Sequence, residues 1–304
     1  MSGPAQTNDG RDRAGEALSR LAVLGDYPPE LSSDLVGAAL ALSRMERPDL
    51  DLEPYFAHVT DVTDQVGRAC LMDESPDDAL RSVLVETFGY SGDEVGYDDL
   101  DNADMARVID RKRGLPVALG ILWISVARAH GWHAEGLDVP NHFLIRVFED
   151  GADRSEGWVF DPFHGGKVMS DYEIEMMTHR MGGGGPISSA YPAYAGAGGN
   201  LRKGSRGPRA VSDRSVLLRL QNNIKLRRFQ AEDLEGGLAT LSAMRTLAPD
   251  LASLALEQAS VLARAGAFAK AHGVLIGYLT AGHGDEGERR DINRFLEALR
   301  SSLN

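Results

Sequence analysis

Apolar residues recur at helical spacing from about residue 16 to residue 90 of the chain. The stretches LVGAALALSRM and DDALRSVLVETFGY each gather them on one side of a helix, and polar residues separate one stretch from the next. We therefore predict a helical region over residues 16–100. The preceding residues 1–15, MSGPAQTNDGRDRAG, have no apolar core, which is typical of a disordered tail rather than of a signal peptide.

The most apolar run of the chain covers residues 116–129. Gly114 and Pro116 introduce it, and proline is well tolerated in the first turn of a helix. Apolar side chains in this run fall on every face of a helix, so other elements must surround it. Its 14 residues (129 − 116 + 1) are fewer than the roughly 18 that cross a bilayer. The run predicts a buried helix that begins near Pro116.

Three stretches of β-like sequence follow, at residues 133–138, 143–149 and 157–161. Residues 181–210 are then rich in glycine, serine, alanine and proline, which is typical of a flexible linker, and residues 211–304 return to helical patterns. This order predicts an α+β fold, in which the buried helix packs on a small antiparallel sheet between N-terminal helices and a C-terminal helical tail. The core with the sheet would cover residues 101–180.

The C-terminal helical tail contains one internal period. Three pairs of residues are separated by 34 positions, as in 268 − 234: Leu234 and Phe268, Gly237 and Ala271, and Leu241 and Leu275. This is the repeat length of tetratricopeptide helix pairs, in which small residues recur where two helices approach closely. Two copies are too few for a free-standing solenoid, which needs about three. We predict tetratricopeptide-like helices that dock on the rest of the chain.

The second and third β-like stretches predict an antiparallel hairpin. If its loop is centred between Gly151 and Ala152, Ile145 lies opposite Trp158 and His142 lies opposite Asp161. One face of the hairpin then carries Phe143, Ile145, Val147, Trp158 and Phe160. On the other face the carboxylate could hold one ring nitrogen of the histidine and leave the second free, as in a general base. The alternative interpretation is that the two side chains only satisfy each other's hydrogen bonds.

The net charge of the chain argues against some classes of partner. Its 32 lysine and arginine residues and 45 aspartate and glutamate residues give a net charge of −13, which argues against a general affinity for nucleic acid or for anionic membranes. Residues 201–228 differ, with nine basic residues and one acid, Asp213. They predict either a solvated helix face or a strip that docks on an acidic surface, such as the chain's own GDEVGYDDLDNAD. No interleaved aromatic residues indicate RNA binding.

The single cysteine, Cys70, excludes intramolecular disulfides and fits a reducing, cytoplasmic compartment. It lies 46 residues before Pro116 (116 − 70), in a helical pattern that favours a small buried apolar residue over a nucleophile. Ser125 lies roughly 13 Å along the predicted helix from Pro116, at a rise of about 1.5 Å per residue. We expect Ser125 to be packed rather than reactive.

Three ordered motifs resemble one known family. RKRGLPVALGILWISVARAHGW, GLDVPNHFLIRVF and WVFDPFHGGKVMS are together similar to the SirB family of transglutaminase-like proteins, whose core is followed by tetratricopeptide-type helices. The flanking stretches LALSRMERPDLDLEPYF and LLRLQNNIKLRRFQAEDLEGGLATLSAMRTLAPD resemble the helical regions on either side of that core. The resemblance implies a papain-like arrangement, in which a cysteine begins the buried helix and a histidine and an aspartate lie on adjacent strands. Here the last two would be His142 and Asp161.

The position that the resemblance assigns to the nucleophile has no thiol. Residues 114–118, GLPVA, contain no cysteine, serine or threonine, although the N-terminus of a helix would stabilise a thiolate there. In SirB-like sequences the pattern G-x-P stands where active enzymes have G-x-C. This departure argues against the cysteine mechanism.

We expect neither a metal nor another cofactor. The conceivable metal ligands are His130, His133, His142, Asp161 and His164. They follow no metalloprotease or cysteine-rich zinc spacing, and glycine and loop residues separate them.

Two hypotheses for the function remain. The first is a non-catalytic cytoplasmic scaffold that holds a protein or peptide through the cleft of a papain-like ancestor and through its helical tail. The second is an amide or ester hydrolase or transferase, in which His142, oriented by Asp161, activates water or a substrate group without a covalent cysteine intermediate. Asn102, Asn141 and Phe163 would line the cleft in either case. We favour the first because the nucleophile is missing.

Overall fold

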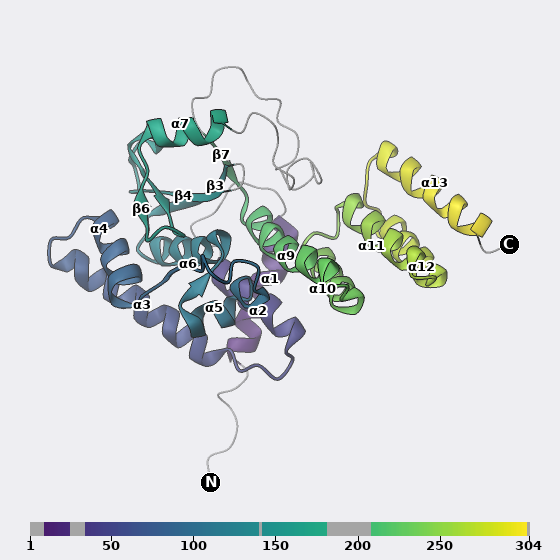
Figure 1. Cartoon of the computed structure of the whole chain (residues 1–304), viewed down its shortest axis with the longest axis horizontal. Coiled ribbons are helices and arrows are strands. Elements are labelled where there is room, and N and C mark those ends of the chain that lie inside the picture. Colours follow the sequence, from purple (N-terminus) through teal and green to yellow (C-terminus); the bar gives the residue numbers. More distant parts are fainter. Residues whose placement is uncertain (1–8, 25–33, 140–141, 181–207, 303–304) are drawn as a thin grey trace, which may run out of the picture. The chain divides into compact units, whose positions relative to one another are not determined.

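The computed structural model describes residues 9–24, 34–139, 142–180 and 208–302 of the chain (Figure 1). The chain divides into two compact units, Met1–Leu220 and Gln221–Asn304. The division falls inside helix α9, Asp213–Gln230, so the first turns of that helix belong to the first unit. All the strands within the described residues lie in this first unit.

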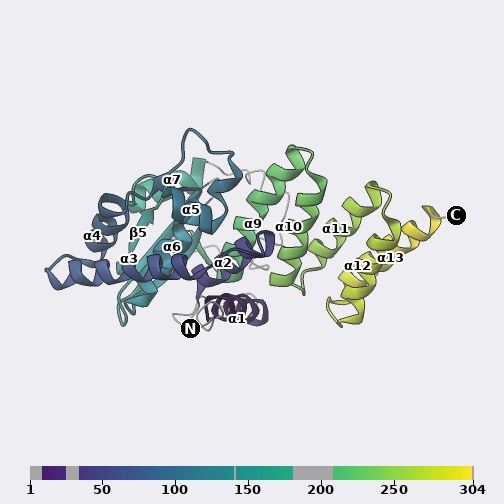
Figure 2. The same ribbon diagram turned by 90° about the horizontal axis from the view of Figure 1, so that it is seen from below.

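The N-terminal helices are α1 Asp9–Leu24, α2 Leu35–Glu46, α3 Glu53–Leu71, α4 Pro76–Arg81 and the π-helical segment η1 Ser82–Thr87 (Figure 2). They agree with the helical region that the apolar pattern predicts. Helix α1 differs from the prediction, because it begins at Asp9, inside the expected disordered tail. Its residues Ala14, Ala17 and Leu18 are buried, and their spacing puts them on one side of the helix. Helix α1 lies against α2, which gives this small apolar side something to pack on.

Four short elements lead to the central helix: β1 Ser91–Gly92, the 3-10 turn η2 Leu100–Asn102, α5 Met105–Arg111 and β2 Arg113–Gly114. Strands β1 and β2 are parallel and pair with each other. Helix α5 ends because Lys112 adopts a left-handed backbone conformation with φ 56°.

Helix α6, Pro116–Ala129, is the buried helix of the prediction and begins at the predicted residue. Every residue from Val117 to Ile124 is buried. Pro116 lies in the first turn, where its missing N–H removes no hydrogen bond of the helix. The helix lies between the sheet and helices α2 and α3, which is why it has no polar face (Figure 1).

The first unit has one five-stranded antiparallel sheet, in the order β6-β5-β4-β3-β7. Its strands are β3 His133–Val139, β4 His142–Phe148, β5 Trp158–Asp161, β6 Lys167–Val168 and β7 Arg209–Val211. Strands β3, β4 and β5 confirm the three predicted β-like stretches. The sequence does not predict β6 and β7, because strands of two and three residues are too short for a recognisable alternation.

The pairing of β4 with β5 differs from the predicted register by two residues. Ile145 pairs with Phe160, where the prediction places Trp158. The connecting loop is not a symmetrical turn, because the 3-10 turn η3, Arg154–Glu156, takes up three of its residues and Asp153 caps it. A shift of two residues leaves every side chain on its predicted face, since the side-chain period of a strand is two. The predicted faces are therefore correct, and the predicted pairs across the strands are wrong.

The face of the sheet that packs on α6 is organised around one aromatic ring. Phe143 lies between Gly120 of α6 and Gly136 of β3, and a Cβ atom added to these glycines would lie 2.4 Å and 2.7 Å from its ring. Glycine at both positions therefore allows the helix and the strand to approach the ring. Trp123 of α6 is 1% exposed, and its ring centroid lies 5.2 Å from that of Phe160.

The opposite face of the sheet carries a second apolar cluster, which consists of Leu137, Val139, Leu144, Val159, Met169 and Ile174. Ile174 belongs to helix α7, Asp171–Arg180, which lies on the other side of the sheet from α6 (Figure 1). By alternation along the strands, His142 and Asp161 share this face with Leu144 and Val159. Both faces of the sheet are thus covered, and the two candidate residues lie at one end of β4 and β5.

A buried ion pair fastens the end of α6. Arg128 donates to both carboxylate oxygens of Asp213 in α9, at 2.6 Å and 2.9 Å, and both side chains are almost fully buried. The same guanidinium donates twice to the carbonyl of Ala134 in β3. One arginine therefore connects the end of the central helix, the first part of the sheet and the beginning of α9, and its fork-shaped donors suit both acceptors.

The second unit contains the end of α9 and helices α10 Leu234–Leu247, α11 Ala252–Arg264, α12 Phe268–Thr280 and α13 Glu286–Ser302. Helix α12 begins 34 residues after α10 (268 − 234), and α13 begins 34 residues after α11 (286 − 252). Phe229 of α9 packs on Gly237, where an added Cβ would lie 2.2 Å from the ring. The helix starts thus have the predicted spacing, and the tetratricopeptide assignment stays a prediction.

No helix within the described residues is both long and apolar enough to cross a bilayer.

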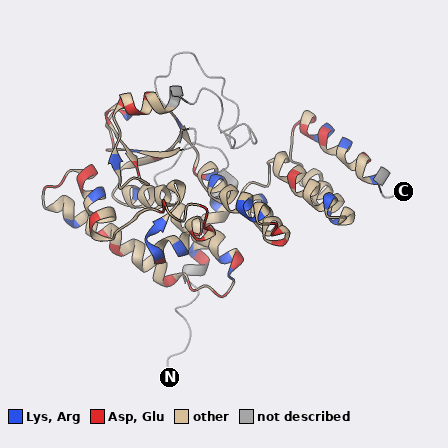
Figure 3. Ribbon diagram, viewed as in Figure 1, with Lys and Arg blue, Asp and Glu red and all other residues tan. Residues whose placement is uncertain are grey.

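Figure 3 shows acidic and basic residues mixed along the helices rather than separated by sign. Groups of opposite charge therefore have close neighbours with which they can pair.

Replacing Trp123 by alanine should lower the free energy of unfolding by about 3 to 5 kcal/mol, because it removes a large buried ring and leaves a cavity against the sheet. Trp132→Ala is the matched control, since Trp132 follows α6 and is only half-buried; it should cost clearly less. Denaturant unfolding followed by circular dichroism measures both variants. A loss below about 1 kcal/mol for Trp123→Ala would show that α6 is not the centre of the fold.

Candidate functional site

The turn that follows β5 is built on the carboxylate of Asp161. Its Oδ1 accepts hydrogen bonds from the backbone N–H groups of Phe163 at 3.0 Å and His164 at 3.2 Å. Pro162, between Asp161 and Phe163, has no N–H to satisfy, so the carboxylate reaches the next two donors. The carbonyl of Asp161 also accepts from Gly166 at 3.0 Å, and the carboxylate is 4% exposed. We call residues 161–166 the Asp161 turn.

The histidine held by Asp161 is His164. Asp161 Oδ2 lies 2.7 Å from His164 Nδ1. Because an ionised carboxylate only accepts hydrogen bonds, Nδ1 carries the proton, and Nε2 of the neutral ring remains an acceptor. The ring is 47% exposed, so solvent and ligands can reach it.

The predicted cross-strand contact between His142 and Asp161 is therefore wrong, because the register of β4 and β5 differs by two residues. His142 pairs with Val139 across the sheet, and its ring centroid lies 6.4 Å from that of His164. The two histidines thus lie close together beside one aspartate. The sequence signal for His164 is its position three residues after Asp161 and two residues after Pro162, which favours a local turn over a cross-strand bond.

An arginine of α9 holds the backbone of His142 at the beginning of β4. Its carbonyl accepts a 2.6 Å hydrogen bond from the Arg219 guanidinium of α9, which also lies over the Phe143 ring at 5.4 Å. The arginine thereby fixes the first residue of β4. Asn141, the preceding candidate, lies outside the described residues.

Gly92 joins the Asp161 turn to the start of α6. Its N–H donates to the carbonyl of Phe163 at 2.9 Å, and it pairs with Gly114 in the β1–β2 ribbon. An added Cβ on Gly92 would lie 2.5 Å from the Phe163 ring, so only glycine permits this approach. Residues 114–116, the G-x-P motif, and residues 161–163, DPF, are thereby brought together, although Pro116 and Asp161 are 45 positions apart (161 − 116).

Aromatic rings surround the exposed part of this turn. The Phe163 ring lies 5.8 Å from that of Tyr97 and 5.1 Å from that of His164, edge to face in both cases. Phe163 itself is 9% exposed and Tyr97 is 42% exposed. We call Tyr97, Phe163 and His164 the aromatic rim. Val95, in the same loop as Tyr97, is completely exposed.

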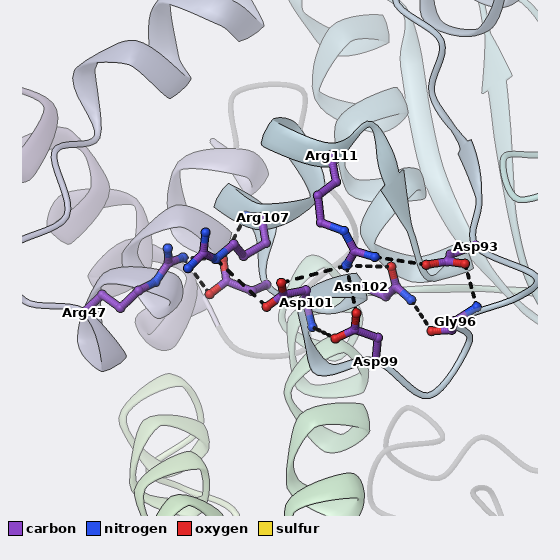
Figure 4. Close-up of polar contacts among 9 residues, drawn as sticks. Arg47, Asp93, Gly96, Asp99, Asp101, Asn102, Arg107 and Arg111 are labelled. Carbon is purple, nitrogen blue, oxygen red and sulfur yellow. Dashed lines mark hydrogen bonds and ion pairs between the residues drawn. The ribbon is translucent and has the colours of Figure 1, made fainter.

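Asn102 organises the acidic loop, residues 93–104, from inside (Figure 4). Its Nδ2 donates to the carbonyl of Gly96 at 2.6 Å, and its Oδ1 accepts from Arg111 at 3.4 Å. Its own carbonyl accepts from the N–H of Leu115, the residue before α6. Asn102 is 0% exposed, so it holds the loop against the start of α6 rather than lining a cleft as the sequence suggests.

Arginines near the acidic loop offset part of its negative charge (Figure 4). Arg111 pairs with Asp93 at 3.1 Å and with Asp99 at 3.3 Å, and Arg47 donates to both oxygens of Asp104. The N–H of Gly96 helps to lower the pKa of Asp93. The alternative that residues 201–228 dock on this loop stays a prediction.

The start of α6 offers no nucleophile. Leu115, Pro116 and Val117 occupy its cap and first turn. Cys70 lies in the last turn of α3, and burial raises the pKa of its thiol, so that less of it is thiolate at neutral pH. The hydroxyl of Ser125 accepts from the N–H of Val36 at 3.2 Å, which is a structural role.

Two of the conceivable metal ligands contact other groups. His130 contacts the carbonyl of Thr63 at 3.0 Å, and His133 contacts Asp150 at 3.1 Å. Within the described residues, no three histidine, cysteine, aspartate or glutamate side chains are grouped so that they could hold a metal ion.

A comparison with models of protein families gives a match to this chain. Residues 53–222 match the model of a family described as the transglutaminase-like superfamily. This segment contains the central helix, the whole sheet and the Asp161 turn. It also ends within α9, two residues beyond the division between the units.

Similar proteins include a UPF0162 protein of Xylella fastidiosa (strain 9a5c), 28% identical over 276 residues, which are 89% of this chain and 85% of that protein. A UPF0162 protein of Vibrio cholerae is 25% identical over 164 residues, or 53% of this chain and 58% of that protein. F-box only protein 21 of Mus musculus is 30% identical over 105 residues, or 33% of this chain and 17% of that protein. No solved structure gives a significant match.

Asp161→Ala should lower the free energy of unfolding by about 1 to 3 kcal/mol, because two backbone N–H groups lose their acceptor in a buried turn. His164→Ala should cost less than about 1 kcal/mol, since its ring is half exposed. Asp153→Ala is the matched control: that carboxylate makes the same kind of cap to Ser155, but at an exposed position, and its loss should matter less. Denaturant titrations compare the three. Equal stability of the Asp161 and Asp153 variants would contradict a structural role for the Asp161 turn.

Proposed function

The chain belongs to the transglutaminase-like superfamily, and from this premise we propose that it is a binding protein that holds a protein or peptide segment at the aromatic rim. We further infer that it is a SirB-type protein with tetratricopeptide-type C-terminal helices. The order of its three motifs and the 34-residue spacing of its helix starts (268 − 234) support this assignment. The single cysteine supports a cytoplasmic location.

The observation that carries the proposal is the chemistry at the start of α6. In the papain-like arrangement this helix end stabilises a thiolate, but here its first residue is Pro116, whose side chain has no nucleophilic atom. Cys70 cannot replace it from the last turn of α3, and its thiol has a raised pKa. A covalent mechanism through cysteine therefore has no group to begin it.

The aromatic rim supports peptide binding instead. Aromatic side chains contribute strongly to protein interfaces, because they bury a large area at little cost in conformational entropy. His164 adds a directed acceptor, since its Nδ1–H is held by Asp161 and its Nε2 can accept an N–H from a bound segment. The partial match to F-box only protein 21, which covers 17% of that protein, is consistent with a module that serves inside larger proteins.

A second candidate function is supported by the contact between Asp161 and His164. A histidine whose Nδ1–H is held by a carboxylate is arranged as a general base, and His142 lies beside it as a second imidazole. Such a site could activate water for amide or ester hydrolysis without a cysteine. It differs from the enzyme hypothesis based on the sequence in that Asp161 orients His164 and not His142.

Selection of a random peptide library on the immobilised protein tests the binding proposal. Enriched peptides should lose affinity for Tyr97→Ala by about tenfold or more, the usual effect of removing an interface hot spot. Tyr172→Ala is the matched control, because Tyr172 is also an exposed tyrosine of the first unit, 70% exposed on α7. Binding to this control should remain at the wild-type level. A library that yields only peptides insensitive to Tyr97→Ala would contradict the proposal.

Turnover assays separate the two functions. We expect no hydrolysis of a broad panel of amides and esters, and we expect Cys70→Ala to leave peptide binding unchanged. If the wild type hydrolyses a substrate and His164→Ala lowers the rate by roughly a hundredfold without unfolding, the general-base alternative is correct. If Cys70→Ala abolishes binding or turnover in a folded protein, the assignment of Cys70 as a packed residue is wrong.

A further inference from the structure

Three ionisable side chains meet outside the candidate site. His58 comes from α3, Tyr90 follows η1, and Lys112 caps the end of α5. Lys112 Nζ lies 2.8 Å from His58 Nε2 and 3.2 Å from the Tyr90 hydroxyl, and that hydroxyl lies 2.8 Å from the same His58 Nε2. We call these residues the amine cluster. They form a triangle of hydrogen-bonding groups in which each lies within reach of the other two.

The partners of Lys112 differ from those of other lysines in the chain. Lys167 pairs with Glu173, and the fully buried Lys225 pairs with Glu257. Lys112 has no carboxylate within ion-pair distance among the described residues. Its polar neighbours are an imidazole and a phenol, which are neutral in their ordinary forms at pH 7.

Burial shifts the pKa of each of the three groups toward its neutral form. Burial lowers the pKa of Lys112, while the more distant Asp110 acts in the opposite direction. Burial and the charge of Lys112 lower the pKa of His58, which Asp61 raises. Burial also raises the pKa of Tyr90. The edge of Phe88 against the His58 ring adds an apolar wall to the cluster.

The position of Lys112 is also costly for the backbone. Its φ of 56° is left-handed, a conformation that glycine adopts far more readily than lysine. The lysine side chain crosses the Tyr90 ring, with Nζ 4.8 Å from the ring centroid, and ends at His58. Lys112 and His58 are both only half-buried, whereas Tyr90 is 1% exposed. A small molecule can therefore approach a side chain that the cluster holds in place.

We propose that Lys112 is a nucleophilic amine that forms an imine with the carbonyl carbon of an aldehyde or ketone ligand. An amine beside a proton acceptor and a proton donor is the arrangement that this reaction needs. His58 Nε2 is the acceptor, and the Tyr90 hydroxyl beside it is the donor. The site lies apart from the aromatic rim and does not depend on the peptide-binding proposal.

The reaction balances within the cluster and water. The Nζ lone pair attacks the carbonyl carbon, the C–N bond forms, and the carbonyl π pair moves to oxygen. Two protons leave the nitrogen, the first to His58, and two reach the oxygen, the first from Tyr90. The oxygen departs as water and a C=N bond remains. No oxidant or reductant takes part, and water reverses the reaction.

Reductive trapping tests this proposal on the full chain. Pyridoxal is the probe, and cyanoborohydride converts its imines to stable secondary amines that peptide mass spectrometry can map. The chain has only five lysines, Lys112, Lys167, Lys203, Lys225 and Lys270, so every site can be followed. At pH 7 Lys112 should be labelled at least about tenfold faster than the exposed Lys270, a modest part of the usual contribution of acid–base assistance.

The dependence on pH gives a readout that needs no variant. Because only the neutral amine reacts, the labelling rate at Lys112 should level off at a lower pH than the rate at Lys270. Coincident profiles, or equal rates at pH 7, would overturn the proposal.

Two variants test the proton acceptor and donor. His58→Gln keeps a polar side chain but removes the base, and Tyr90→Phe keeps the buried ring but removes the hydroxyl. Each should lower the labelling rate at Lys112 by about tenfold while Lys270 stays unchanged. Circular dichroism identifies the variant that keeps the wild-type fold. A folded variant that labels Lys112 at the wild-type rate would show that the cluster only holds the end of α5 in place.

Discussion

The arrangement of the first unit depends on how closely α6 can approach the sheet. The ring of Phe143 fills the space between Gly120 and Gly136, and a side chain on either glycine would collide with it. Protein interiors are close-packed, so a displaced ring moves the backbone on both sides. The burial of α6 from Val117 to Ile124 requires the present spacing, because the helix has no polar face to turn to solvent. One contact therefore fixes both the central helix and the first part of β4.

The candidate site is positioned by the same means. An added Cβ on Gly166 would lie 2.3 Å from the Trp123 ring, and one on Gly92 would lie 2.5 Å from the Phe163 ring. In each case an aromatic ring of one segment occupies the space that a side chain of another would need. The Asp161 turn is thus held by α6 on one side and by β1 on the other. Its internal hydrogen bonds shape the turn and orient His164.

Sequence patterns predict the elements of this protein better than the contacts between them. The run from Pro116 and the β-like stretches are long periodic signals, and their bounds agree closely with the structure. The register of β4 and β5 depends on a loop containing a 3-10 turn, which the strand pattern does not encode. The bond between Asp161 and His164 is local, so a search across strands misses it. The beginning of helix α1, residues 9–15, has too few apolar residues to be recognised before its packing on α2 is known.

The stretch RKRGLP places two different electrostatic environments at the two ends of β2. After it, α6 presents a helix N-terminus, which stabilises an anion such as a thiolate, but Pro116 has no group that could ionise there. Before it, Lys112 turns its amine onto Tyr90 and His58. An amine has the opposite requirement, because it is nucleophilic only when neutral, and desolvation beside neutral partners favours that form. The chain thus keeps a helix end suited to a thiolate that it lacks, and it supplies the environment of a reactive amine four residues earlier (116 − 112).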